Sequence, residues 1–146
     1  MPNAARVVKA VADSNVIVSG LIWDGPPASL LDRAAMRLFH LKTSEEILTE
    51  VQRVLQRPHL KEKLRVRGQT PEGMLAAYRG VAEIVTPAEV PLPAGLRDPD
   101  DLLVLRCAVG ADAMAIVTGD NDLLIMKEYA GIPIMTPRHF LGSIGH

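Results

Sequence analysis

Short apolar runs alternate along this chain with stretches of helical periodicity. Apolar runs bounded by polar residues predict buried strands over residues 7–12, 41–43, 84–85, 113–117 and 132–135. Apolar residues at spacings of three and four predict helices over 28–39, from about 43 to 58, over 60–66, from 71 onward, and over 98–109 and 123–130. Strands that alternate with helices predict an α/β fold in which helices flank a central parallel sheet, an α/β/α sandwich.

Several residues with special backbone preferences predict where these elements begin and end. Thr43 and Glu46 have capping-box spacing, so we expect a helix to begin at Thr43. Pro58 is expected to end that helix. Three prolines within residues 86–97 predict a surface loop. Pro133 favours an edge position for the last strand, because proline has no backbone N–H to donate to a neighbouring strand.

Length and composition favour one folded domain over residues 1–146. Apolar residues make up 48 % of the chain, which is enough to build a core. No apolar stretch approaches the roughly 18 residues of a membrane span, and the N-terminal residues lack the form of a secretion signal. The single cysteine cannot form an intramolecular disulfide. We therefore expect a cytoplasmic protein without membrane association.

Four acidic residues stand where a carboxylate is unusual. Asp13 and Asp120 each follow a predicted buried strand, so both lie at the ligand-binding edge of a parallel sheet. Glu50 lies at the rim of the apolar stripe of its helix. Asp101 projects toward the core side of its helix, whereas Asp100 projects away from it. Carboxylate oxygens are preferred ligands of Mg²⁺ and Mn²⁺, so the four residues predict a site for one or two such ions.

Each of these carboxylates also has a purely structural explanation. Helix capping alone explains one acidic stretch: Asp98, Pro99 and the two aspartates that follow form a favourable helix start, and no functional role is needed to account for them. Asp13 and Asp120 could close polar turns, and Glu50 could form an ion pair at the surface. The sequence also leaves open whether Asp100 or Asp101 supplies the third carboxylate.

Five segments, taken in their order and spacing, carry a resemblance to a known family. They are Val11–Val16, Ser44–Val51, Asp98–Asp101, Ile116–Leu124 and Ile134–Leu141. Together they resemble the PIN-domain nucleases, close to the VapC-like toxins and the related toxin–antitoxin PIN proteins. The resemblance spans about residues 7–141. It implies a parallel sheet surrounded by helices, an acidic pocket for Mg²⁺ or Mn²⁺, and hydrolysis of phosphodiester bonds in RNA.

The resemblance also assigns roles to individual residues. The family's acidic positions correspond to Asp13, Glu50, Asp101 and Asp120. Its auxiliary polar positions correspond to Asn15, Thr118 and Asp122, and Asp98 could assist from the helix cap. Asp13 would be the central metal ligand. The metal would lower the pKa of a bound water that attacks the phosphorus, and it would neutralise charge on the phosphate oxygens.

A basic segment suggests how a polyanion would be bound. Residues 53–67 hold six basic residues and one acidic residue, a net charge of +5, although the whole chain carries −1. Such a segment can contact phosphates, and a solvated helical face is the alternative. The candidate phosphate contacts are Arg53, Arg57, Lys61 and Lys63. With the resemblance, these residues lead us to expect RNA as a partner. The resemblance also implies an antitoxin, and we expect a homodimer, although no sequence feature shows one.

Two other interpretations of the acidic residues stay open. A receiver-type or other Mg²⁺-dependent phosphoryl-transfer domain also places an aspartate after its first strand. It would need a second aspartate close to Asp13, which Ser14 and Asn15 do not supply. A PIN-like module that binds partners without catalysis, or that acts on DNA, is the other alternative.

Overall fold

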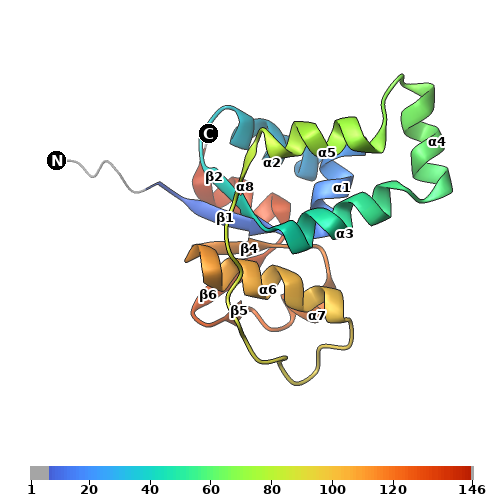
Figure 1. Cartoon of the computed structure of the whole chain (residues 1–146). Helices are drawn as coiled ribbons and strands as arrows, with labels where there is room; N and C mark the ends of the chain where they lie inside the picture. The colour runs from blue at the N-terminus through green and yellow to red at the C-terminus, as the bar shows by residue number, and fades with distance from the viewer. Residues whose placement is uncertain (1–6, 146) are drawn as a thin grey trace.

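A six-stranded sheet lies at the centre of the computed structural model, which describes residues 7–145 (Figure 1). The strand order is β3-β2-β1-β4-β6-β5. All neighbouring strands are parallel except β5, which runs antiparallel to β6. The strands are β1 Lys9–Ala12, β2 His40–Thr43, β3 Ala82–Ile84, β4 Ala115–Val117, β5 Glu128–Tyr129 and β6 Ile132–Met135. The predicted mostly parallel central sheet is confirmed.

Eight helices within the described residues flank this sheet. They are α1 Ser14–Ile22, α2 Pro26–Ala35, α3 Glu45–Leu55, α4 Pro58–Val66, α5 Pro71–Arg79, α6 Pro99–Ala111, α7 Asn121–Leu124 and α8 Pro137–Ile144. Five of them begin at a proline, which fits because the first helical residue needs no backbone N–H donor. Helix α3 ends at Leu55, shortly before Pro58, as predicted, and Pro58 also begins α4. None of these helices is both long and apolar enough to cross a membrane.

Two predicted helix ends are wrong for local reasons. The cap of α3 is Ser44, whose Oγ accepts a hydrogen bond of 3.2 Å from the amide of Ile47, and not Thr43. Adjacent hydroxyl residues offer nearly the same capping spacing, so the pattern could not separate them. Helix α2 ends at Ala35 and not near residue 39, because the left-handed backbone of Arg37 turns the chain.

The segment after β4 differs most from its prediction. The helix expected over residues 123–130 is confined to α7, and the chain then forms β5. Left-handed conformations at Lys127 and Ala130 end the helical path, and apolar spacing carries no sign of them. Strand β6 is also not an edge strand, because β5 pairs with it and places Glu128 opposite Pro133.

The topology brings the carboxyl ends of β1 and β4 together. Ala12 of β1 pairs with Val117 of β4, so the residues that follow these strands lie side by side. A receiver-type domain has the order 2-1-3-4-5, with its third strand beside its first. Here β4 lies beside β1, and β3 lies beyond β2 at the edge of the sheet. The receiver-type alternative is therefore wrong.

Helices α3, α4 and α5 form an arm that extends away from the sheet, with α4 at its far end (Figure 1). The basic segment of residues 53–67 runs from the end of α3 through α4. The chain returns through β3 and the predicted loop over residues 86–97, which contains no helix or strand. This loop crosses α6, where the amide of Ala88 donates a hydrogen bond of 2.9 Å to the carbonyl of Arg106.

Candidate metal centre

Asp13 joins the ends of the two central strands. It directly follows β1, and its amide donates a hydrogen bond of 3.1 Å to the carbonyl of Val117 in β4. Its Oδ1 caps α1 by accepting from the amide of Val16 at 2.9 Å, and its Oδ2 accepts from the hydroxyl of Thr118. Burial raises the pKa of the Asp13 carboxyl, and the bonds from Thr118 and Val16 oppose that increase. The residue is 8 % exposed, and these hydrogen bonds fix the position of its carboxylate.

A chain of hydrogen bonds continues from Thr118 to the start of α7. The amide of Asp120 donates to Thr118 Oγ1 at 2.9 Å. The amide of Asp122 then donates to Asp120 Oδ1 at 3.0 Å, which makes Asp120 the cap of α7. Each polar side chain thus orients the next, and the hydroxyl group of Thr118 links Asp13 to Asp120.

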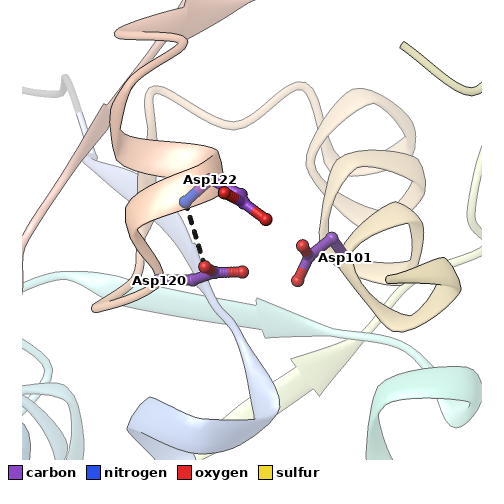
Figure 2. A group of neighbouring side chains, drawn as sticks. All are labelled: Asp101, Asp120 and Asp122. Atoms are coloured by element: carbon purple, nitrogen blue, oxygen red, sulfur yellow. Dashed lines mark hydrogen bonds between the residues drawn. The ribbon is translucent and has the colours of Figure 1, made fainter. Parts of the chain in front are cut away.

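Three carboxylates meet beside this turn, and we call them the aspartate cluster: Asp101, Asp120 and Asp122. Each contributes one oxygen to a group in which all oxygens lie within 4.8 Å of one another. Figure 2 shows Asp101 on its helix facing the other two aspartates across a gap, with the Asp122 amide bonded to Asp120. Asp101 comes from the first turn of α6, so segments about twenty residues apart build the cluster.

The electrostatics of the aspartate cluster fit a hard divalent cation. Asp101 Oδ2 is buried and has no hydrogen-bond partner among the described residues. Burial and the neighbouring carboxylate of Asp120 raise the pKa of Asp101 to about 7. An unpartnered buried oxygen and repulsion between carboxylates both cost stability. A bound divalent ion would relieve both costs, because hard divalent cations take oxygen ligands of this kind.

Glu50 lies outside the aspartate cluster and pairs with an arginine. Arg53 Nε and Nη2 donate to Glu50 Oε1 at 3.1 and 2.5 Å, and Nη2 also donates to Asp100 Oδ2 at 3.1 Å. At the start of α6, Asp100 faces Arg53, and Asp101 belongs to the aspartate cluster. Glu50 thus has the ion pair that the sequence leaves as its alternative. Arg53, expected to be a phosphate contact, already holds two carboxylates.

The remaining candidates lie around the centre and on the arm. Asp98 caps α6, with its Oδ1 accepting from the amide of Asp100 at 2.9 Å. Asn15 lines a cavity that also contains Asp120. On the arm, Lys63 Nζ lies 4.6 Å from the centre of the Trp23 ring. Arg57 and Lys61 are exposed at the start of α4.

Asp122 is the residue whose part in the site the sequence understates. It is predicted only as an auxiliary residue, but its carboxylate belongs to the aspartate cluster. The signal is present in the chain, because Asp120 and Asp122 are two residues apart directly after a strand. When the first of two such residues caps a helix, the second lies in the first turn and both carboxylates can face the same side.

The comparisons agree with this geometry. The family model of the PIN domain matches residues 9–122, which is more than half of the chain and includes all the residues of the aspartate cluster. No curated protein matches the chain. PIN domains are generally metal-dependent nucleases, and the acidic group that such chemistry needs is present here. The chain belongs to the PIN domain family.

Proposed function

We propose that this protein is an Mg²⁺- or Mn²⁺-dependent endoribonuclease and the toxin of a toxin–antitoxin pair. The observation that carries the nuclease is the aspartate cluster, whose oxygens lie within 4.8 Å and include one buried oxygen without a donor. RNA as substrate and the toxin role are supported by the five sequence segments that resemble VapC-like proteins. An antitoxin that covers the centre, a homodimer and a cytoplasmic location belong to the same proposal.

The residues divide into ligands and groups that position them. Asp101, Asp120 and Asp122 would hold one ion directly, and Asp13, which directly follows β1, would complete the site or help to bind a second ion. Thr118 positions Asp13 and Asp120 through its hydroxyl group. A bound divalent ion supplies an activated water and charge neutralisation at the phosphate.

Glu50 is a further candidate ligand that lies outside the aspartate cluster. Its side chain is 11 % exposed, and Arg53 holds it beside Asp100. On the arm, Arg57, Lys61 and Lys63 are proposed to contact the RNA backbone, since phosphate contacts supply most of the affinity for nucleic acid. Arg53 could join them only by giving up an ion pair.

Digestion of total RNA with Mn²⁺, followed by mapping of the cut ends, tests the proposal. The wild-type protein should cut at defined positions, and Asp13→Ala and Asp101→Asn should abolish cutting while circular dichroism shows a retained fold. Asp100→Asn is the matched control, because Asp100 lies in the same helical turn but faces Arg53. It should retain most of the activity.

Three results would contradict parts of the proposal. Cleavage that survives Asp101→Asn would remove the aspartate cluster from the chemistry. Cleavage of single-stranded DNA but not RNA would favour the DNA-directed alternative. A wild-type protein that shows no Mn²⁺ binding by calorimetry would favour the non-catalytic module. Expression in bacterial cells tests the toxin role, since growth should stop with the wild type and continue with Asp101→Asn.

A further inference from the structure

A cavity of about 690 Å³ opens beside the aspartate cluster. It lies between α1, the start of α2, the turn after β4 and the start of α8, and it shares Asp120 with the cluster. Its volume is within the range of roughly 300–1,000 Å³ that is usual for small-molecule sites. Whatever occupies this cavity therefore lies next to the atoms that would react.

The wall of the cavity is mostly apolar. Pro26, Pro27 and Pro137 contribute rings, and Val16 contributes a methyl-bearing side chain. Prolines have no backbone N–H, so this wall offers flat contact surface and few hydrogen bonds. A surface of this kind suits the face of a nucleobase or a sugar better than a charged group.

Two kinds of polar group interrupt the apolar wall. Ser19 and Asn15 line it with a hydroxyl and an amide, and neither side chain has a hydrogen-bond partner within residues 7–145. Arg138, in the first turn of α8, is exposed and has no ion-pair partner among the described residues. Within the described part of the chain, Arg138 and Asp120 are the charged residues that line the cavity.

We infer that this cavity binds one unpaired nucleotide of the substrate, next to the phosphate that is cut. The base packs on the prolines, Ser19 and Asn15 meet its polar edge, and Arg138 binds a phosphate of the same strand. This inference rests on the proposed function, since the shared Asp120 is what makes the occupant a substrate. A base inside a duplex cannot enter such a cavity, so the substrate is single-stranded or looped at this position.

Arg138 is suited to this task because nothing else within residues 7–145 competes for it. Arg53, by contrast, is held by Glu50 and Asp100. A guanidinium group binds phosphate through a charge-assisted pair of hydrogen bonds, which is stronger than a bond between neutral groups. Arg138 thus lines the cavity as a cation that no carboxylate of the described residues pairs with.

The test uses adenosine 5′-monophosphate and adenosine as probes, titrated into isotope-labelled protein and followed by NMR in Mg²⁺. We expect shifts at the amides of Ser19, Gly119 and Arg138. Arg138→Gln should reduce the preference for the monophosphate over the nucleoside about 5-fold. Arg33→Gln is the matched control, because Arg33 makes no described ion pair and does not line the cavity, and it should leave the preference unchanged.

A second variant tests the apolar wall. Gly119 lines the cavity, and a Cβ at this position would meet no atom within 4 Å, so Gly119→Leu should fold and fill the space. It should weaken the binding of both probes about 10-fold or more. Probe-induced shifts that lie outside the cavity, or an unchanged preference in Arg138→Gln, would overturn the inference. Neither probe contains a phosphodiester bond, so these results do not depend on whether the protein cleaves RNA.

Discussion

Replacing Asp101 with asparagine should stabilise the metal-free protein. The Asp101 carboxylate has a buried oxygen without a donor and lies close to the carboxylate of Asp120. Asparagine keeps the shape of the side chain and removes its charge, so the repulsion and the cost of burying the charge both disappear. The same change removes a ligand, so the variant should lose stabilisation by metal.

The size of the effect follows from the pKa of Asp101, which burial and Asp120 raise from 3.8 to about 7. A shift of about three units corresponds to a ceiling of about 4 kcal/mol, and partial exposure to solvent reduces this to about 2 kcal/mol. The pKa is higher in the folded protein than in the unfolded chain. The destabilisation is therefore complete above pH 7 and is relieved as the pH falls toward 4, because the folded protein then takes up the proton.

Urea unfolding in EDTA, followed by circular dichroism, measures this effect. At pH 8, Asp101→Asn should unfold with a free energy about 2 kcal/mol higher than the wild type, and at pH 5 the gain should fall to less than half. Asp100→Asn should show no gain at either pH, because it loses a pair with Arg53 and relieves no repulsion within the aspartate cluster.

Mn²⁺ at one hundred times its dissociation constant should then add about 2.7 kcal/mol to the wild type and little to Asp101→Asn. A variant that is no more stable than the wild type at pH 8 in EDTA would refute the idea that the cluster is strained without its ion. A gain of equal size at pH 5 and pH 8 would show that the cause is not the charge.

Three further predictions test the surroundings of the centre. The affinity for Mn²⁺, measured by calorimetry, should increase about 10-fold for each unit by which the pH is raised toward 7, and it should change little above pH 7. The reason is that the ion must displace the proton of Asp101. Thr118→Val removes the hydroxyl bonded to Asp13, so urea unfolding should show a loss of about 1–3 kcal/mol and RNA cleavage should weaken. Gly110→Ala should lower the free energy of unfolding by about 1–3 kcal/mol in the same assay, because a Cβ would lie 2.2 Å from the Thr86 carbonyl oxygen. Gly80→Ala is the control and should lower it less, because its Cβ would meet no atom closer than 3.4 Å.

The strand-end aspartates show which parts of a site can be predicted from sequence. A buried parallel strand is visible as a short apolar run, and the carboxyl ends of adjacent parallel strands meet at one edge. The positions of Asp13 and Asp120 therefore follow from the pattern alone. Helical periodicity assigns Asp101 and Asp100 to different sides of α6, and the structure agrees, since Asp100 contacts Arg53 whereas Asp101 belongs to the aspartate cluster.

The direction of a long side chain is harder to predict, because it depends on its partners. Periodicity places Glu50 correctly at the rim of a buried stripe, but its carboxylate turns to Arg53, which lies three residues later. That spacing brings side chains together on a helix and was available as a signal. The second bond of Arg53, to Asp100 on α6, joins residues forty-seven positions apart and has no local signature.

The ion pair of Arg53 helps to define where the metal would bind. One guanidinium group neutralises Glu50 and Asp100, so those two carboxylates have a protein cation in the metal-free state. Asp101, Asp120 and Asp122 have none within residues 7–145, although one oxygen of each lies within 4.8 Å of the others. Like charges at such distances are costly, so the negative charge that lacks a compensating cation lies at the aspartate cluster and not at Glu50. The expected position of the metal thus depends on two things: three carboxylates lie close together, and Arg53 pairs with other carboxylates instead of with these three.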